Sequence, residues 1–226
     1  MSAAVIAIDG PSASGKSTVA KRVAGAMGYL YVDSGSLYRG ITWRMMELKV
    51  DAAVIDSVKA ALERIRMEFF VADGAVRFKV DGYEPVSEIR SEAVNGQVSR
   101  FAAIPEVRRL VVARLREMAK MGDLVIEGRD IGTAVFPNAR FKFYLDASPA
   151  ERAKRRLMEM AEKSSDLSEN KVGESLKKRD KIDSSRHMDP LKIAEGATVL
   201  DSTGMEIQQV VDLILTSIGR NMEVKK

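Results

Sequence analysis

The sequence has no cysteine and a single histidine, His187. The lack of cysteine excludes disulfides, iron–sulfur clusters, cysteine-ligated zinc and cysteine nucleophiles. One histidine cannot build a multi-histidine metal site. It would also have to reach distant residues to form a serine triad, so both kinds of site are excluded. We expect His187 at the surface. No apolar run approaches the ~20 residues of a membrane span, and Asp9 interrupts the apolar N-terminal stretch before it could act as a signal sequence. We therefore expect a soluble, cytoplasmic protein with no membrane association.

The charged residues are nearly balanced in number but unevenly distributed. Lys and Arg number 36 and Asp and Glu 32, and the formal charge of +4 is too small to indicate nucleic-acid binding by itself. Between Glu151 and Lys192, 12 residues are basic and 9 acidic, so half of this stretch is charged. Two interpretations stay open: a solvated helical surface, or a mobile basic flap over an anionic ligand.

Short apolar runs alternate with amphipathic stretches along most of the 226 residues, a length that fits one large domain or a core with an insertion. The first run, Ala4–Ile8, is rich in β-branched residues and ends in a glycine turn, which is typical of a buried parallel strand. The alternation predicts an α/β protein with a parallel sheet. Further strands are expected at 29–32, 124–126, 141–145 and 198–200, and helices at 16–27, 36–48, 52–64, 105–119, from 148 onward and 206–218.

The pattern changes between residues 67 and 100. Two Asp-Gly pairs, at 73–74 and 81–82, separate three alternating runs, and Asp-Gly in such a place is a strong hairpin signal. We therefore predict antiparallel strands at 67–72, 75–80 and 83–86 in a small inserted subdomain. The core would then comprise residues 1–66 and 101–226, with residues 67–100 inserted to bind the acceptor. Within the charged stretch, a loop is expected at 164–168.

Residues 10–17 match the phosphate-binding motif G-x-x-x-x-G-K-[ST] at every position, between a predicted strand and a predicted helix. In such a loop, backbone N–H groups and the helix N-terminus surround phosphate oxygens. Lys16 adds a positive charge at the terminal phosphates, and the Ser17 hydroxyl is placed to bind Mg²⁺. The motif therefore indicates nucleoside triphosphate binding.

This loop is compatible with a small-molecule kinase, a regulatory GTPase, or a motor or nucleic-acid ATPase. The guanine-reading motif N-K-x-D is absent, because Asn170-Lys171 is followed by no acid at the fourth position. A strand ending in paired acids is also absent, and the nearest candidate ends in Glu127. A nucleic-acid ATPase needs aromatic residues for base stacking, yet none lies between Leu145 and the C-terminus. We therefore favour a kinase.

Arginines gather where an anionic acceptor would bind. Arg39 lies one turn into the helix after the second strand, so that its guanidinium and the Ser34 hydroxyl can grip one phosphate. Arg129 and Asp130 follow a buried strand, at the edge where α/β sheets bind ligands, and we expect Arg129 to keep Asp130 ionised. A third group shares one face of a predicted helix: Arg179, Asp183 and Arg186. Each group also has a purely structural explanation. The first can be a helix cap with a surface arginine, the second a structural ion pair, and the third a set of surface ion pairs.

Five motifs in this order, with a small β insertion between them, closely resemble the bacterial-type cytidylate kinases. They are GPSASGKST (10–18), DSGSLYR (33–39), IEGRDIGTAVFP (126–137), ERAKRR (151–156) and RDKIDSSR (179–186). The resemblance extends from Val5 to about Thr203. It implies a P-loop nucleoside-monophosphate-kinase-like fold: a parallel sheet flanked by helices, an enlarged monophosphate-binding insertion and a short lid at about 157–186. It also implies transfer of the γ-phosphoryl group of ATP to CMP or dCMP with Mg²⁺.

The resemblance further implies roles for individual residues. The ATP phosphates are expected on Gly10, Pro11, Ser12, Ala13, Ser14, Gly15, Lys16, Ser17 and Thr18. The CMP phosphate is expected on Ser34, Tyr38, Arg39, Arg129 and Arg186, the cytosine on Ser99, Arg108 and Asp130, and the ribose on Arg179 and Asp183. The residues expected to act in catalysis are Lys16, Arg129, Arg156 and Arg186. Arg152 is expected to bind ATP, because Arg152 and Arg156 lie four residues apart on one helix face and can point at one ligand.

The identity of the acceptor depends on Asp130. A carboxylate accepts from the exocyclic amine of cytosine and is repelled by the carbonyl of uracil. UMP or another nucleoside monophosphate, or a non-nucleotide acceptor, stays open as an alternative. No general base is evident, which suits phosphoryl transfer because its catalysis rests on in-line positioning and cations. We expect a monomer that binds ATP and CMP or dCMP, and no nucleic acid.

Overall fold

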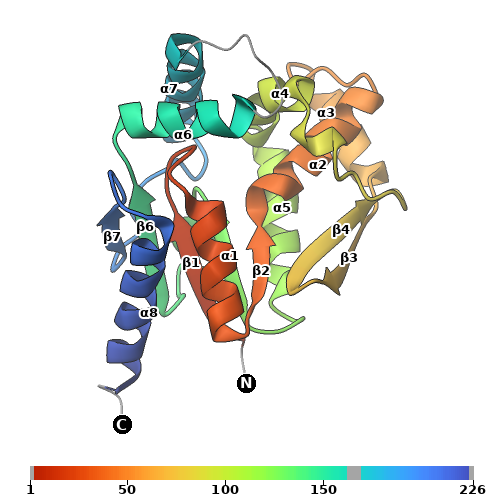
Figure 1. Cartoon of the computed structure of the whole chain (residues 1–226). Helices are drawn as coiled ribbons and strands as arrows, with labels where there is room; N and C mark the ends of the chain where they lie inside the picture. The colour runs from red at the N-terminus through yellow and green to blue at the C-terminus, as the bar shows by residue number, and fades with distance from the viewer. Residues whose placement is uncertain (1–2, 162–168, 224–226) are drawn as a thin grey trace.

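The computed structural model of the chain describes residues 3–161 and 169–223. Within these residues, seven strands form one sheet in the order β3-β4-β2-β5-β1-β6-β7 (Figure 1). Neighbouring strands run parallel, except that β3 and β4 pair antiparallel. The strands are β1 (Val5–Asp9), β2 (Leu30–Asp33), β3 (Met67–Ala72), β4 (Ala75–Val80), β5 (Leu124–Gly128), β6 (Phe141–Asp146) and β7 (Thr198–Asp201). The predicted α/β class is therefore confirmed.

Alternation along β1 sends side chains into two hydrophobic cores on opposite faces of the sheet. Val5 and Ala7 pack in one core, and Ile6 and Ile8 pack in the other. Helices α1 (Lys16–Met27) and α8 (Ile207–Glu223) contribute to the core of Ile6 and Ile8 and lie on one side of the sheet (Figure 1). The other core includes residues of α2 (Ser34–Glu47), α3 (Ile55–Arg64), α4 (Glu92–Ala102) and α5 (Pro105–Met118). Because both faces are covered, the central strands are continuous apolar runs.

The predicted helices and parallel strands occur with their ends shifted by a few residues. The largest shift is in α8, which continues to Glu223 rather than ending at residue 218. Such differences at helix ends are common, because the last turns lack part of their hydrogen bonding. In the described parts of the chain, no helix combines the length and the apolar character needed to cross a membrane.

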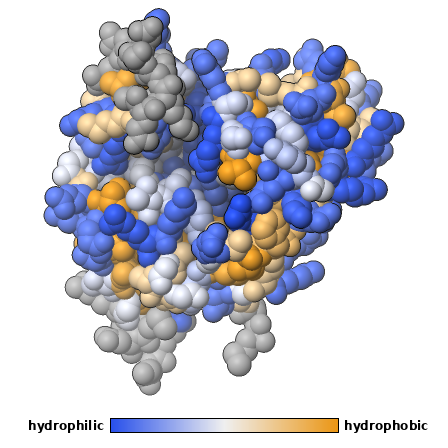
Figure 2. Space-filling model, turned by 45° about the vertical axis from the view of Figure 1, so that its right-hand side comes forward, coloured by the Kyte–Doolittle hydropathy of each residue, from blue (hydrophilic) through white to orange (hydrophobic). Residues whose placement is uncertain are grey.

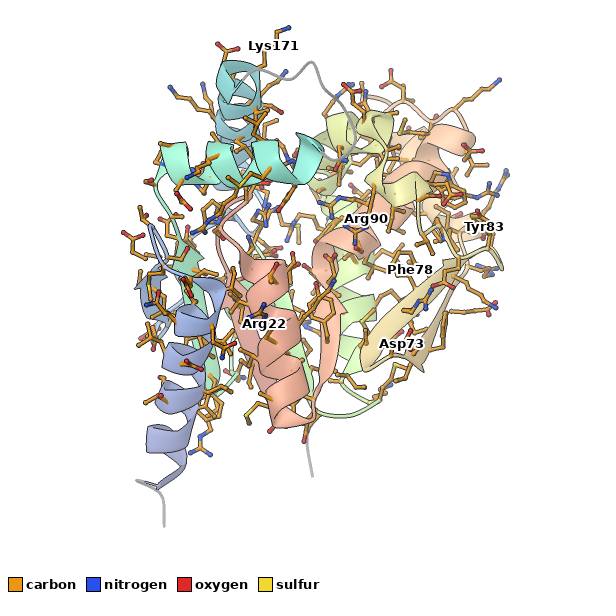
Figure 3. All side chains as sticks on the ribbon, in the orientation of Figure 1. Arg22, Asp73, Phe78, Tyr83, Arg90 and Lys171 are labelled. Atoms are coloured by element: carbon orange, nitrogen blue, oxygen red, sulfur yellow. The ribbon has the colours of Figure 1, made fainter. Side chains whose placement is uncertain are left out.

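The segment 67–100, predicted to be an insertion, begins with the predicted hairpin. Strands β3 and β4 pair over their whole length, and β4 also pairs with β2 through Tyr31 and Ala75, so that the hairpin extends the main sheet. Helix α2 packs closely on this extension. A Cβ at Gly40 would lie 2.5 Å from the ring of Phe78, which Figure 3 labels on β4. The hairpin is therefore part of the sheet.

The predicted third strand, at 83–86, is wrong. Tyr83 forms an isolated bridge with Val80 across the Asp-Gly turn, and the chain then enters a 3₁₀ turn, η1 (Glu88–Arg90), that leads into α4. Pro85 lacks the N–H group that a strand ladder needs. The carboxylate of Glu84 is taken up by an ion pair with an arginine of β4. The second half of the insertion is therefore helical, and it faces the carboxyl ends of the strands.

Helices α6 (Pro149–Ala161) and α7 (Glu169–Ser185) lie beyond the end of β1 and α1 at which the phosphate-binding motif is found (Figure 1). They pack on each other around Ala153, Val172 and Leu176, and Ala13 of the motif contacts this small cluster. The loop predicted at 164–168 lies outside the described residues. The charged stretch thus sits beside the loop that follows β1.

Candidate active site

The loop between β1 and α1 has the backbone geometry of a phosphate-binding loop. Gly10 has a φ of 153°, and a Cβ there would lie 2.0 Å from the Leu145 carbonyl oxygen, so the position requires glycine. Gly15, the N-cap of α1, has a φ of 89°, and Ala13 has a φ of 60°. This curvature lets backbone N–H groups converge on a phosphate at the N-terminus of α1.

Lys16 is buried at the start of α1. Its ammonium donates to the Pro11 carbonyl oxygen at 2.5 Å and to the Ser14 hydroxyl at 3.2 Å, so it lies across the loop. Burial, and next the positive charge of Arg129, lower the pKa of Lys16 to about 7. An anion bound in the loop would reverse this effect, because it favours the charged form of the amine.

A carboxylate at the end of β5 lies beside Ser17. The Ser17 hydroxyl donates to Glu127 Oε1 at 2.6 Å, and the Tyr31 hydroxyl donates to the same oxygen at 3.3 Å. Burial and the charge of nearby Asp33 raise the pKa of Glu127. Among the described residues, no group of three or more His or acidic side chains forms a metal site of its own. The hydroxyl and carboxylate oxygens here suit Mg²⁺ shared with a bound phosphate, the usual arrangement for this ion.

A cavity of about 260 Å³ connects the phosphate-binding loop with α2, η1, α4, α6 and α7. Among the described residues, seven cationic side chains line it: Lys16, Arg39, Arg90, Arg129, Arg156, Arg179 and Arg186. The acidic side chains that line it are Asp33, Glu127, Asp130, Glu159 and Asp183. Hydrophilic side chains border the hollow in the middle of the face shown in Figure 2. The excess of positive charge suits a polyanionic ligand.

Arg179 lies among other cations in this cavity. Burial, and then the charges of Arg129 and Arg39, lower the pKa of Arg179 to about 10. Its Nε and the hydroxyl of Tyr38 are buried without a hydrogen-bond partner among the described residues. Because buried polar groups nearly always have a partner and both residues line the cavity, these two groups point to a ligand in the cavity.

Asp130 is held by two arginines. Its carboxylate pairs with Arg108 and, at 3.3 Å, with Arg186. Burial raises the pKa of Asp130, while the charges of both arginines act in the opposite direction. The expectation that Arg129 keeps Asp130 ionised is wrong, because Arg129 pairs with Asp183 at 3.0 Å. Neighbouring residues at the end of a strand point their side chains to different sides, so each forms its own ion pair.

The structure brings most of the predicted site residues to the wall of this one cavity. Besides the ionised groups above, those that line it are Ser12, Ala13, Gly15, Ser17, Thr18, Ser34, Tyr38 and Ser99. Gly10, Pro11 and Ser14 belong to the same loop but are not part of the wall. Arg108 is fully buried behind Asp130 and is also not part of the wall.

The arginines of α6 differ in what they contact. Arg152 donates to the Ser12 carbonyl oxygen at 3.2 Å and pairs with Asp180, so it supports the loop from behind. Arg155 donates to another carbonyl oxygen of the loop at 3.3 Å. Of the two arginines predicted to point at one ligand, Arg156 lines the cavity and Arg152 does not.

Asp33 and Arg90 also line the wall, and the sequence analysis assigned no role to either. Asp33 caps α2 by accepting from the Ser36 N–H at 2.8 Å, and an acid directly before a helix was a usable signal for this cap. Arg90 approaches the cavity from η1, and Figure 3 shows it on the inner side of this segment. Arg90 had no such signal, because no helix or strand was predicted for residues 87–100.

Asp9, at the end of β1, was noted in the sequence only as a break in an apolar run. In the structure its carboxylate accepts from the N–H groups of Ile131 and Gly132 at 2.8 and 2.7 Å. These residues begin the π-helical turn η2 (Ile131–Val135) after β5. Burial raises the pKa of Asp9 to about 6. Asp9, which directly precedes the phosphate-binding loop, thus fixes the turn that begins after Asp130.

Comparisons with known proteins agree with this geometry. The sequence model of the cytidylate kinase family matches residues 6–220. A cytidylate kinase from Caldanaerobacter subterraneus subsp. tengcongensis is 40% identical over 216 residues, which cover 96% of this chain and 95% of the relative. A cytidylate kinase from Bacillus subtilis is 40% identical over 213 residues, which cover 94% of this chain and 95% of the relative. Among solved structures, a gluconokinase from Sinorhizobium meliloti shares the fold, with a TM-score of 0.51 and 13% identity over 99% of this chain and 97% of that one. The chain therefore belongs to the cytidylate kinase family.

Proposed function

We propose that this protein transfers the γ-phosphoryl group of ATP to CMP or dCMP and so forms ADP and CDP or dCDP. Membership of the cytidylate kinase family supports this reaction. The observation that carries the proposal is that the phosphate-binding loop and the arginines Arg39, Arg129, Arg179 and Arg186 line one cavity. Donor and acceptor phosphates bound there would lie close enough to react.

On the donor side, residues Gly10–Thr18 would hold the ATP phosphates and Arg156 would face the transferred group. The ammonium of Lys16 would leave its contacts with the loop and pair with the β- and γ-phosphates. Ser17 and Glu127 would hold Mg²⁺ together with these phosphates. When bound, the ion supplies positive charge that neutralises the phosphate oxygens. Arg152 would act on ATP through the loop backbone that it supports.

On the acceptor side, the CMP phosphate would bind between α2, β5 and α7. The residues proposed to hold it are Ser34, Tyr38, Arg39, Arg129 and Arg186. Ser99 and Asp130 would face the cytosine, with Arg108 acting through Asp130, because Arg108 is buried behind that carboxylate. Arg179 and Asp183 would contact the ribose. The unpartnered Tyr38 hydroxyl and Arg179 Nε would then find partners on the ligand.

The proposed chemistry depends on cations rather than on a strong base. The transferred phosphoryl group carries its charge on three equatorial oxygens in a loose transition state. Lys16, Arg129, Arg156 and Arg186 line the same cavity, so they would stabilise that charge and align the reacting oxygens of the two phosphates. Cations that are already in position need no reorganisation during the reaction.

We further infer that residues 67–100 form an acceptor-binding insertion in a core of 1–66 and 101–226. Arg90 and Ser99 of this segment line the cavity, which supports that role. A monomer is also proposed, because the side chains of this chain already supply both the phosphate-binding loop and the acceptor arginines of the cavity. A cytoplasmic location is proposed because ATP and nucleoside monophosphates are found there. Nucleic acid and membrane are not proposed as partners, since the cavity fits small nucleotides.

A coupled assay of ADP formation with CMP, dCMP, UMP, AMP, dTMP and shikimate tests the proposed function. We expect the highest kcat/KM with CMP or dCMP and little ATP turnover without an acceptor. A preference for another monophosphate would correct the acceptor, and turnover that requires a polynucleotide instead would overturn the assignment.

Amide exchange in α7 is expected to slow by about tenfold when a bisubstrate nucleotide analogue binds. We propose a lid at about 157–186, of which residues 162–168 lie outside those described. The hydrophobic cluster that α6 and α7 share is small, with Ala153, Val172 and Leu176 as its buried members. A bound ligand would therefore contribute much of the stability of these two helices. Hydrogen exchange with mass spectrometry measures this change, with α8 as the internal reference. Unchanged exchange in Glu169–Ser185 would contradict a lid.

Nucleotide binding at about pH 8 is expected to take up close to one proton. Lys16, with a pKa of about 7 in the free protein, is mostly neutral at that pH, and bound phosphates raise its pKa. Affinity should therefore fall by up to about tenfold per pH unit above 7, whereas below about pH 6 Lys16 is already charged and takes up no proton. Calorimetry in buffers of different ionisation enthalpy measures the uptake. The same uptake in a Lys16→Met variant would show that another group is responsible.

A further inference from the structure

Arg108 of α5 is a fully buried cation, and each of the three nitrogens of its guanidinium donates a hydrogen bond. Its Nη2 donates to Asp130, its Nε donates to Asp189 Oδ2 at 3.1 Å, and its Nη1 donates to the Ala102 carbonyl oxygen at 3.4 Å. Its guanidinium also lies 5.6 Å from the centre of the Tyr38 ring. Because Arg108 is fully buried and is not part of the cavity wall, its influence on the cavity in this structure passes through Asp130.

Asp189 is placed by the loop that follows α7. Its φ of 46° lies in the left-handed region, which aspartate tolerates better than most residues. The Arg186 Nε donates to the Asp189 carbonyl oxygen at 2.8 Å, and the Leu191 N–H donates to the Asp183 carbonyl oxygen at 2.8 Å. The loop is thus folded back on the end of α7, and this fold directs the Asp189 carboxylate toward α5.

Four charged groups form a balanced cluster behind the base-binding wall. Arg108 and Arg186 both pair with Asp130, and Asp189 supplies the second negative charge. Without Asp189, the Asp130 carboxylate alone would have to balance two buried cations. Its oxygens would then be drawn farther toward the arginines and would be less available to a ligand in the cavity.

We propose that Asp189 is a positioning residue for the acceptor base: it holds the Nε edge of Arg108, so that Arg108 keeps Asp130 oriented toward the cavity. This role rests on the proposed function, in which Asp130 faces the cytosine. Asp189 itself is absent from the cavity wall, and its hydrogen bonds join it to Arg108 and Arg186 rather than to the phosphate-binding loop. Its loss should therefore weaken acceptor binding and leave ATP binding alone.

Two substitutions separate the charge of Asp189 from its backbone. Asp189→Asn keeps an oxygen acceptor and tolerates the left-handed conformation, while Asp189→Gly removes the side chain without backbone strain. Both keep the carbonyl oxygen that Arg186 contacts. Asp81 is a matched control, since it has a φ of 50° and its Oδ2 pairs with an arginine Nε, that of Arg44, at 2.6 Å, away from the cavity.

We expect Asp189→Asn to raise KM for CMP by about threefold to tenfold and Asp189→Gly by about tenfold or more. In both variants kcat and KM for ATP should stay within about twofold to threefold of the parent, and the ratio of kcat/KM for CMP to that for UMP should fall. Calorimetric titration with CMP, in which no turnover occurs, should show the tightest binding for the parent, weaker binding for Asp189→Asn and the weakest for Asp189→Gly. Asp81→Asn and Asp81→Gly should leave all these values unchanged.

The role of Asp189 is overturned if KM for CMP stays within twofold of the parent in both variants. It is also overturned if KM for ATP rises in parallel with KM for CMP while Tm falls, because Asp189 would then support the fold in general. A parent protein that neither binds nor phosphorylates CMP would instead show that the proposed function is wrong. A parent that uses CMP, with variants that behave like it, would reject the positioning role alone.

Discussion

The Lys16→Ala variant is expected to lose about 10²–10³-fold in kcat/KM, equivalent to about 3–4 kcal/mol of transition-state stabilisation. Lys16 is the loop cation placed to meet the β- and γ-phosphates, and no other lysine lines the cavity among the described residues. The variant should keep its fold. Burial already disfavours the charged form of Lys16, so its removal relieves a desolvation cost. Steady-state kinetics and thermal unfolding measure both effects.

Lys21→Ala is the matched control for this experiment. Lys21 lies on the same helix but is exposed, with its ammonium 5.4 Å from the centre of the Tyr31 ring. Its removal should change kcat/KM by less than about twofold, because an exposed cation–π contact is worth about 0.5–1 kcal/mol and lies outside the cavity. A Lys16→Ala variant with near-normal kcat and an unaltered melting profile would refute the assignment of the phosphate-binding loop.

The Asp130→Asn variant is expected to lose both acceptor selectivity and stability. A carboxylate accepts from the cytosine amine, whereas an amide can also donate to the uracil carbonyl, so the CMP:UMP ratio of kcat/KM should fall by roughly tenfold to a hundredfold. The same change leaves Arg108 and Arg186 beside a neutral partner in a buried site. Breaking such a pair costs about 3 kcal/mol in the free energy of unfolding. Kinetics with both acceptors and denaturant unfolding measure the two effects.

Two outcomes would contradict the base-reading role of Asp130. One is a CMP:UMP ratio within twofold of the parent. The other is a collapse of CMP turnover with no change in that ratio, which would mean that Asp130 orients the phosphate site through Arg186. The Asp81→Asn variant is the control for stability, because its partner Arg44 is 30% exposed and such ion pairs contribute about 0–1 kcal/mol.

The parts of the protein that the sequence predicted well depend on residues close together in the chain. The phosphate-binding loop is one contiguous segment, and the positive φ values of Gly10 and Gly15 are met by the residue type itself. The hairpin of β3 and β4 follows from its Asp-Gly turn in the same way. The alternation of β1, with Val5 and Ala7 on one face and Ile6 and Ile8 on the other, is also local.

The prediction of a third strand at 83–86 failed because Pro85 is incompatible with the strand that the alternating pattern indicated. The run at 83–86 follows an Asp-Gly turn and alternates as a strand does, but Pro85 removes a backbone donor and the chain turns into η1 instead. Arg90 and Ser99 reach the cavity from η1 and α4, which follow this run and for which no helix was predicted. The resemblance to cytidylate kinases had already placed Ser99 at the acceptor. The position of Arg90 on the cavity wall became evident only from the structure, in which residues 88–90 form η1.

The sequence by itself determined the nucleotide-binding loop, the α/β class and the family, because each depends on motifs or periodicities within short segments. The tertiary structure alone decided which arginine pairs with which acid. Arg129 pairs with Asp183, 54 residues away, and Arg108 pairs with Asp189, 81 residues away, while Arg129 makes no ion pair with its neighbour Asp130. Arginines are chemically equivalent in the sequence, and the partner of each is set by which carboxylate the folded chain brings within about 4 Å in a buried, weakly screened site.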